Sequence, residues 1–157
     1  MKILFLDIDG VMNSHASALN SGGDLTKFAP EAVSTLNAVL QETGACVVIS
    51  SSWRCSRTME EMCILLEEQG VVCSVVGMTP DLSGYDSATK IYTAPPRGLE
   101  IAMWLHETEE SIEGICIVDD GDDMEDLKHK LVQTTWEHGL TTEHKQELID
   151  KLLQPYV

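Results

Sequence analysis

Close to the start of the chain, residues 3–13 read Ile3-Leu4-Phe5-Leu6-Asp7-Ile8-Asp9-Gly10-Val11-Met12-Asn13. Four apolar residues lead directly into an aspartate, and a second aspartate and a glycine follow. An apolar run of this length before a glycine is typical of a buried central strand of a parallel sheet. Asp7 then lies at the carboxyl end of the strand, which is the edge where open α/β sheets bind their ligands. Because side chains alternate along an extended chain, we expect Asp7 and Asp9 on the same side.

Two carboxylates placed so close together repel each other unless a cation lies between them. The pair therefore suits a nucleophile, an acid and a hard metal ion at one place. Asp-x-Asp-Gly is also compatible with a plain turn, since Asp and Gly are favoured turn residues. A motif this short is a hypothesis until the rest of the chain supplies its context.

The size and composition of the chain predict one folded domain over residues 1–157, since 43% of the 157 residues are hydrophobic. No apolar segment approaches the roughly 18 residues that a membrane span requires. The apolar run at the N-terminus is too short and too acidic for a signal peptide, so we expect a cytoplasmic protein with no membrane partner. The five cysteines form no Cys-x-x-Cys pair, which favours reduced cysteines over a zinc site.

The net charge of −16 is concentrated in one part of the chain. Ten acidic residues and no Lys or Arg lie between Glu107 and Asp126. Such a surface does not attract a polyanion, so unaided binding of nucleic acid is not expected. A solvated face is the ordinary explanation for an acidic run, but Asp119 and Asp120 directly follow an apolar segment and need a separate explanation.

Strand-like and helix-like segments alternate along the rest of the chain. Strands are expected at residues 45–49, 71–76, 114–118 and 131–134, and helices at 30–43, 58–69, 97–107, 124–128 and 142–153. This alternation predicts a Rossmann-like, doubly wound parallel sheet of about five strands. The long connections at residues 12–29 and 77–96 are expected to be functional loops. Neither is long enough for a large cap domain, so a minimal flap is the most that we expect.

Polar residues of complementary kinds follow the expected strands. Asp7, Ser50 and Asp120 come at strand ends, and Arg97 opens a helix. The carboxyl ends of parallel strands converge at one edge of the sheet. Oxygen ligands without Cys or paired His favour Mg²⁺, and Mg²⁺ with a guanidinium and a hydroxyl forms a clamp for a phosphoryl group.

At these residues the chain resembles the haloacid dehalogenase (HAD) superfamily, in its phosphatase branch. The four motifs of that family are matched in order by Asp7-Ile8-Asp9-Gly10, Ser50, Arg97 and Asp119-Asp120. Four further stretches are similar to the small HAD-type domains of "Swiss Army Knife" RNA-repair proteins: Ile49-Ser50-Ser51-Ser52-Trp53-Arg54, Thr79-Pro80, Arg97-Gly98-Leu99-Glu100-Ile101 and Gly139-Leu140-Thr141. The resemblance covers nearly the whole chain and implies the HAD-like fold.

The resemblance also implies roles for the acidic residues. Asp7 would attack phosphorus and form an aspartyl-phosphate. Asp9 would protonate the leaving oxygen and then activate water. Mg²⁺ would bind the Asp7 carboxylate, the backbone carbonyl of Asp9 and Asp120, with Asp119 outside the direct ligands.

The remaining motif residues would bind the phosphate. Ser50 and the backbone amides after it would hold the phosphate oxygens, and Arg97 would neutralise their charge. Lys90 competes with Arg97 for this role, and Ser51 competes with Ser50. The expected substrate-binding residues are Gly10, Ser51 and Arg54. A surface salt bridge is the commoner role for an arginine such as Arg54.

Together these residues predict a Mg²⁺-dependent phosphatase that hydrolyses phosphomonoesters through an aspartyl-phosphate. A phosphorylated small molecule and a nucleic-acid end both remain as substrates, and the second would need basic surface from a partner domain or protein. One alternative is a phospho-sensing module without turnover, which has no need of an acid at Asp9. Another is a metal-dependent nuclease, since paired aspartates with Mg²⁺ also suit phosphodiesters. Ser50 and Arg97 favour the monoester.

Overall fold

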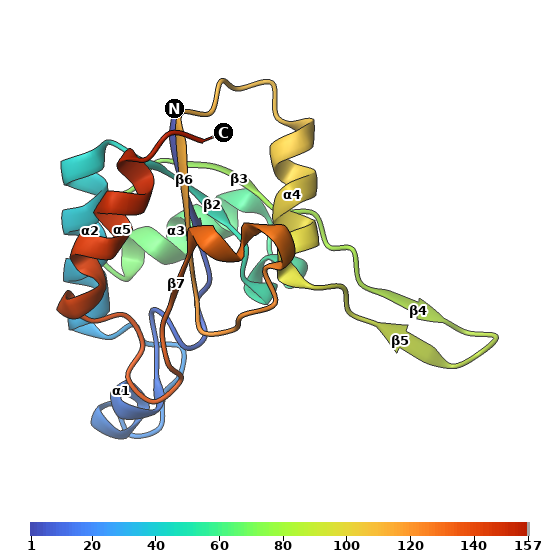
Figure 1. Cartoon of the computed structure of the whole chain (residues 1–157). Helices are drawn as coiled ribbons and strands as arrows, with labels where there is room; N and C mark the ends of the chain where they lie inside the picture. The colour runs from blue at the N-terminus through green and yellow to red at the C-terminus, as the bar shows by residue number, and fades with distance from the viewer. Residues whose placement is uncertain (157) are drawn as a thin grey trace.

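The computed structural model describes residues 1–156 and has a five-stranded parallel sheet at its centre. The strands are β1 (Lys2–Leu6), β2 (Cys46–Ile49), β3 (Val75–Met78), β6 (Gly114–Asp119) and β7 (Leu131–Gln133). Their order in the sheet is β3-β2-β1-β6-β7 (Figure 1). The chain therefore winds outward from β1 in one direction and then returns to build the other side, so the predicted doubly wound parallel α/β fold is confirmed.

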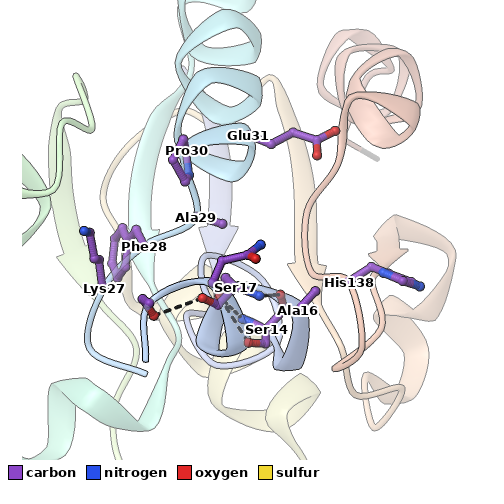
Figure 2. Close-up of a pocket in the computed structure, with 11 residues that line it drawn as sticks. Ser14, Ala16, Ser17, Lys27, Phe28, Ala29, Pro30, Glu31 and His138 are labelled. Carbon is purple, nitrogen blue, oxygen red and sulfur yellow. Dashed lines mark hydrogen bonds between the residues drawn. The ribbon is translucent and has the colours of Figure 1, made fainter. Parts of the chain in front are cut away.

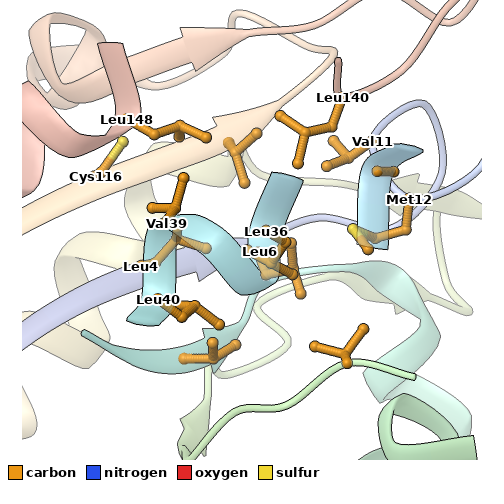
Figure 3. Packing of buried hydrophobic residues seen from close by; sticks show 14 of the residues in the cluster. Leu4, Leu6, Val11, Met12, Leu36, Val39, Leu40, Cys116, Leu140 and Leu148 are labelled. Atoms are coloured by element: carbon orange, nitrogen blue, oxygen red, sulfur yellow. The ribbon is translucent and has the colours of Figure 1, made fainter. Parts of the chain in front are cut away.

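Both faces of the sheet are covered by helices, which are α2 (Pro30–Thr43), α3 (Met59–Glu68), α4 (Arg97–Glu107) and α5 (Lys145–Leu153). Leu4 and Leu6 of β1 belong to the buried cluster that α2, α3 and α5 complete (Figure 3). Ile3 and Phe5 point to the opposite face and pack with α4. β1 is thus buried on both sides, as its unbroken apolar sequence predicts. Within residues 1–156, no helix is long and apolar enough to cross a membrane.

Short elements line the edge of the sheet where the strands end. The connection after β1 forms a small flap around the helix α1 (His15–Asn20), which Ser14 caps. Three 3-10 helices follow later strands or precede α5: η1 (Ser52–Ser56), η2 (Glu125–Lys130) and η3 (Thr142–His144). The expected acidic helix at residues 124–128 is thus a 3-10 helix.

The third strand begins later than the sequence predicts. The apolar run predicts a strand at residues 71–76, but β3 spans Val75–Met78 and Val72 is 77% exposed. Asn37 of α2 explains the shift, since its side chain donates to the carbonyl of Gly70 and accepts from the N–H of Val72. These hydrogen bonds hold the start of the run against the helix instead of in the sheet.

The long connection at residues 77–96 contains a hairpin that the sequence does not predict. Its strands, β4 (Gly84–Asp86) and β5 (Ile91–Thr93), pair antiparallel and project away from the sheet (Figure 1). All six strand residues are exposed. The turn has no Asn-Gly or Asp-Gly pair, the strongest short hairpin signal, and Lys90 takes the left-handed conformation instead, with φ of 57°.

Candidate active site

Three carboxylates meet where β1 and β6 end. Asp7 directly follows β1, and Asp119 is the last residue of β6. The two strands pair in parallel with Leu6 opposite Val118, so their ends coincide. One carboxylate oxygen from each of Asp7, Asp119 and Asp120 lies within 4.8 Å of the other two. Asp7 and Asp119 are buried and Asp120 is half-buried, so the cluster opens to solvent on one side.

Gly10 makes room for this cluster. Its φ of 81° lies in the left-handed region, and a Cβ at this position would lie 2.2 Å from Asp120 Oδ2. The backbone N–H of Gly10 donates to Asn13 Oδ1, and its carbonyl accepts from Thr134 Oγ1. Both backbone groups of Gly10 are thus paired within the protein, and the absence of a side chain admits the Asp120 carboxylate.

Asp9 is held apart from the three clustered carboxylates. Its Oδ1 accepts from the Asn13 side chain at 2.9 Å, and its Oδ2 accepts from Trp53 Nε1 at 3.0 Å. The backbone N–H of Trp53 donates to Ser51 Oγ, so the Ser51 side chain caps η1. The sequence does not predict that Asn13 and Trp53 donate to Asp9. Asn13 lies four residues after Asp9, and Trp53 lies three residues after Ser50. This closeness to the motif residues is the signal in the sequence that points to them.

Arg97 is the cation that faces the carboxylates. Its guanidinium lies 4.0 Å from Asp7 Oδ1 and 3.8 Å from Asp119 Oδ2. Lys90, the competing candidate, lies in the exposed turn of the β4–β5 hairpin, which projects away from the sheet (Figure 1). The geometry therefore brings Arg97, and not Lys90, to the cluster.

The first turn of α4 is fixed in place by the loop after β6. The N–H of Arg97 donates to Asp123 Oδ2 at 3.0 Å, and the N–H of Gly98 donates to the Asp123 carbonyl. Gly98 permits this approach, because a Cβ there would lie 2.2 Å from the carbonyl oxygen of Met124. Asp123 therefore positions Arg97, a role that its place in an acidic run does not reveal.

Besides Thr79 Oγ1 at the end of β3, three buried polar atoms at this edge have no hydrogen-bond partner within residues 1–156, namely Ser50 Oγ, Arg97 Nη1 and Asp119 Oδ2. Ser50 is fully buried, and its N–H donates to the carbonyl of Leu6, which places it beside the end of β1. A buried unpaired polar group costs about 1–3 kcal/mol, so three of them together indicate groups that bind something else. A hydroxyl and a guanidinium suit anionic oxygens, and a carboxylate suits a cation.

Arg54 forms a salt bridge, but in the interior and not at the surface, where such pairs are commonest. This side chain is buried, and its salt-bridge partner is the equally buried Glu100 of α4, at 2.8 Å. Its other N–H groups donate to the carbonyl oxygens of Ser50, Ser51, Thr79 and Pro80. All five donors are used within the protein, so none remains for a phosphate. Arg54 ties the end of β2 to the end of β3 and to α4.

The electrostatics of the cluster favour a bound cation. Burial raises the pKa of the Asp7 carboxyl above its ordinary value, and the Arg97 guanidinium opposes that rise. Burial also raises the pKa of Asp119, and the nearby charge of Asp7 raises it further. Three carboxylates thus face one guanidinium in a partly dry site. A divalent cation with oxygen ligands would balance this charge, so the donor set fits Mg²⁺.

Two cavities flank the carboxyl edge of the sheet. One, of about 310 Å³, lies beside α1 and is lined by Lys27, Phe28 and His138 among others (Figure 2). None of the expected phosphate-binding residues lines it. The second is a cleft of about 400 Å³ between η1, the base of the hairpin and the start of α4. Arg97 lines this cleft and also faces Asp7, so Arg97 links the cleft to the carboxylates, which do not themselves line it.

Comparisons with known proteins agree with this description. A family model described as the HAD domain in Swiss Army Knife RNA repair proteins matches residues 3–145. Among solved structures, the HAD domain of effector protein Lem4 from Legionella pneumophila is similar, with a TM-score of 0.58 over 96% of this chain and 95% of that one. The two sequences are 16% identical, so the likeness concerns the fold alone. No curated protein matches the sequence.

Proposed function

The chain belongs to the family of HAD domains in Swiss Army Knife RNA repair proteins, as the sequence predicts, and we propose that it is a Mg²⁺-dependent phosphatase acting on phosphomonoesters. One observation carries the proposal. The clustered oxygens of Asp7, Asp119 and Asp120 lie within 4.8 Å of one another, beside Arg97 and beside a Ser50 hydroxyl that has no partner among the described residues. The residues that we assign as nucleophile, metal ligands and phosphate-binding groups thus come from elements that meet at one edge of the sheet.

In the first half of the reaction, Asp7 is the nucleophile. An oxygen of its carboxylate forms a bond to phosphorus as the ester P–O bond breaks, which leaves an aspartyl-phosphate on Asp7. Asp9 gives a proton to the leaving oxygen. Asn13 and Trp53 hold the Asp9 carboxyl from two sides, so its direction is set before substrate arrives. Arg97 and Ser50 bind the phosphoryl oxygens.

In the second half, water restores the enzyme. Asp9 takes a proton from a water molecule, whose oxygen attacks phosphorus as the bond to Asp7 breaks. Inorganic phosphate leaves, and Asp9 is protonated again for the next cycle. The same carboxyl group thus serves as acid and then as base, and it lies outside the metal-binding cluster because the Asn13 and Trp53 donors hold it there.

Two side chains would hold the metal ion directly, with the backbone carbonyl of Asp9 as a further ligand. Asp7 is one of them. We propose Asp120 as the direct ligand after β6, because Asp119 Oδ1 already accepts from Gly121 N at 2.8 Å and its Oδ2 faces Arg97. When bound, Mg²⁺ supplies the positive charge that the phosphoryl oxygens and the clustered carboxylates require.

The test is phosphate release from an aryl phosphomonoester, with Mg²⁺ and with chelator, by the native protein and by Asp7→Asn. We expect Mg²⁺-dependent turnover that Asp7→Asn lowers at least about 1,000-fold, since removal of a nucleophile disables the whole catalytic unit. Asp122→Asn is the matched control, because Asp122 is exposed and lies in the same acidic loop outside the cluster. That variant keeps full activity.

Other outcomes would contradict the proposal in distinct ways. A protein that traps beryllium fluoride with Mg²⁺ but releases no phosphate is a phospho-sensing module. Cleavage of a phosphodiester with no action on monoesters indicates a nuclease. Full activity of Asp7→Asn would remove Asp7 from its assigned role.

A further inference from the structure

The cleft beside the carboxylates has walls from three parts of the chain. Arg97 at the start of α4 forms one end, η1 contributes Ser52, and the base of the hairpin contributes Asp81, Tyr92 and Pro95. Its volume of about 400 Å³ is in the range of small-molecule sites. Because Arg97 both faces Asp7 and lines this cleft, a phosphoryl group bound by Arg97 would have the cleft as the space for the rest of the substrate.

The hairpin presents one aromatic ring to the cleft. Tyr92 of β5 lies directly opposite Tyr85 of β4, and each residue is 64% exposed. Only Tyr92 of this pair lines the cleft. Among residues 1–156, no other aromatic ring or cation stacks on Tyr92. An exposed ring with a free face beside a phosphate-binding cation is suited to contact a planar group.

The charges of the cleft limit what that planar group can carry. Arg54 and Glu100 also line it, but they neutralise each other, and Arg54 has no donor to spare. Arg97 is therefore the one cation of the lining that is left for an anion. Asp81 and Asp123 add two carboxylates to the walls. A second phosphate on the substrate would lie close to these carboxylates and would be repelled.

We propose that this cleft binds the leaving group of the substrate and that Tyr92 selects phosphomonoesters whose leaving group contains an aromatic ring and no second anionic group. The inference rests on the phosphatase function proposed above and names the substrate class of the same site. The expected substrates are aryl phosphates and nucleoside monophosphates. Bisphosphates and the phosphorylated ends of long polyanions are expected to be poor substrates.

The experiment compares variants of the two paired tyrosines on three esters: phenyl phosphate, adenosine monophosphate and a glycerol phosphate. A phenolate is a better leaving group than an alkoxide, so each variant is compared with the native protein on the same ester. Tyr92→Ala is expected to lower kcat/KM about threefold to tenfold on an aromatic ester, chiefly through KM. The same variant is expected to change kcat/KM on the glycerol ester by less than about twofold. Tyr92→Phe keeps the ring and is expected to have native kcat/KM on the aromatic esters.

Tyr85→Ala is the matched control, because it removes the opposite member of the same pair without touching the cleft. Its effect on all three esters is expected to stay within about twofold. The two aromatic esters distinguish an aryl group from a nucleoside as the preferred leaving group. Adenosine bisphosphate is expected to have a lower kcat/KM than adenosine monophosphate. Asp81→Asn is expected to reduce this difference in kcat/KM, because it removes one carboxylate from the cleft.

Three results would overturn the inference while leaving the phosphatase function intact. These are an equal loss with Tyr92→Ala on all three esters, an equal loss with Tyr85→Ala, or a native protein that prefers the glycerol ester or the bisphosphate. If the native protein releases phosphate from none of these esters with Mg²⁺, the inference and the phosphatase function fail together.

Discussion

Two groups of buried charges lie within one helical turn of each other along α4, and the fold treats them differently. Arg54 and Glu100 form an ion pair at 2.8 Å, and all five donors of the arginine are used. Arg97 stays 3.8–4.0 Å from the carboxylates of Asp119 and Asp7. Both groups contain an arginine and carboxylates, but only the second keeps polar atoms without partners among the described residues.

The difference separates structure from chemistry. A buried charge is tolerated when its partners are complete, because unpaired buried charges are costly. The Arg54–Glu100 pair has all its partners within the protein, and it joins the ends of β2 and β3 to α4. The Asp7–Asp119–Arg97 group has all its partners only when something binds. Incomplete pairing is therefore the mark of the site, and complete pairing is the mark of its support.

The largest effect expected from this comparison is on stability. Arg54→Met leaves Glu100 buried without its cation and leaves the carbonyl oxygens of Ser50, Thr79 and Pro80 without a donor, which is expected to cost about 3–5 kcal/mol of unfolding free energy. Urea unfolding of the metal-free protein measures it. Arg57→Met is the control, since Arg57 is exposed and stacks on Trp53, so its loss is expected to cost about 1 kcal/mol or less. Equal losses for the two variants would remove the distinction.

The sequence predicts most of the fold because its strong signals are local. The apolar runs of β1 and β6 and the capping box at Thr58 are complete in themselves, and the structure has each element where it is expected. The start of β3 depends on Asn37, which is distant in sequence. In the hairpin turn, Lys90 has a left-handed backbone conformation. No residue pattern in the sequence predicts this conformation.

The site is predictable to the extent that its residues end strands. Asp7, Ser50 and Asp119 do so, and the sheet brings them together because parallel strands share one edge. Arg54 could not be assigned from sequence, since an arginine after a strand serves equally to bind a ligand or to join segments. Its role depends on the Glu100 carboxylate, which comes from another element.

A second prediction sharpens the comparison at two adjacent serines. Ser50 Oγ has no partner within residues 1–156, whereas Ser51 Oγ accepts from the N–H of Trp53. Ser50→Ala is expected to lower kcat/KM about tenfold, the value of one hydrogen bond to a charged phosphoryl group, with unfolding free energy unchanged. Ser51→Ala is expected to cost about 1 kcal/mol of stability through loss of the η1 cap. The reverse pattern would assign the phosphate contact to Ser51.

The smallest effect is the most direct test of incomplete pairing, and it concerns the stability of the metal-free protein. Because the pKa of Asp119 is raised by burial and by Asp7, the folded state binds more protons than the unfolded state above about pH 4. The free energy of unfolding therefore falls as the pH rises from about 4 to the folded-state pKa of Asp119, about 8. Asp119→Asn removes one such charge, so in chelator at about pH 8 it is expected to melt about 2–4 °C above the native protein, which corresponds to about 1 kcal/mol.

The same variant must behave differently at lower pH and with metal. At about pH 5 the native carboxyl is largely protonated, so the difference in melting temperature is expected to shrink. Saturating Mg²⁺ stabilises the native protein by binding the folded state, and Asp119→Asn gains less. Asp122→Asn, whose side chain is exposed, is expected to match the native protein throughout. A variant less stable than the native protein in chelator at both pH values would mean that Asp119, like Arg54, holds the fold together and is not reserved for a ligand.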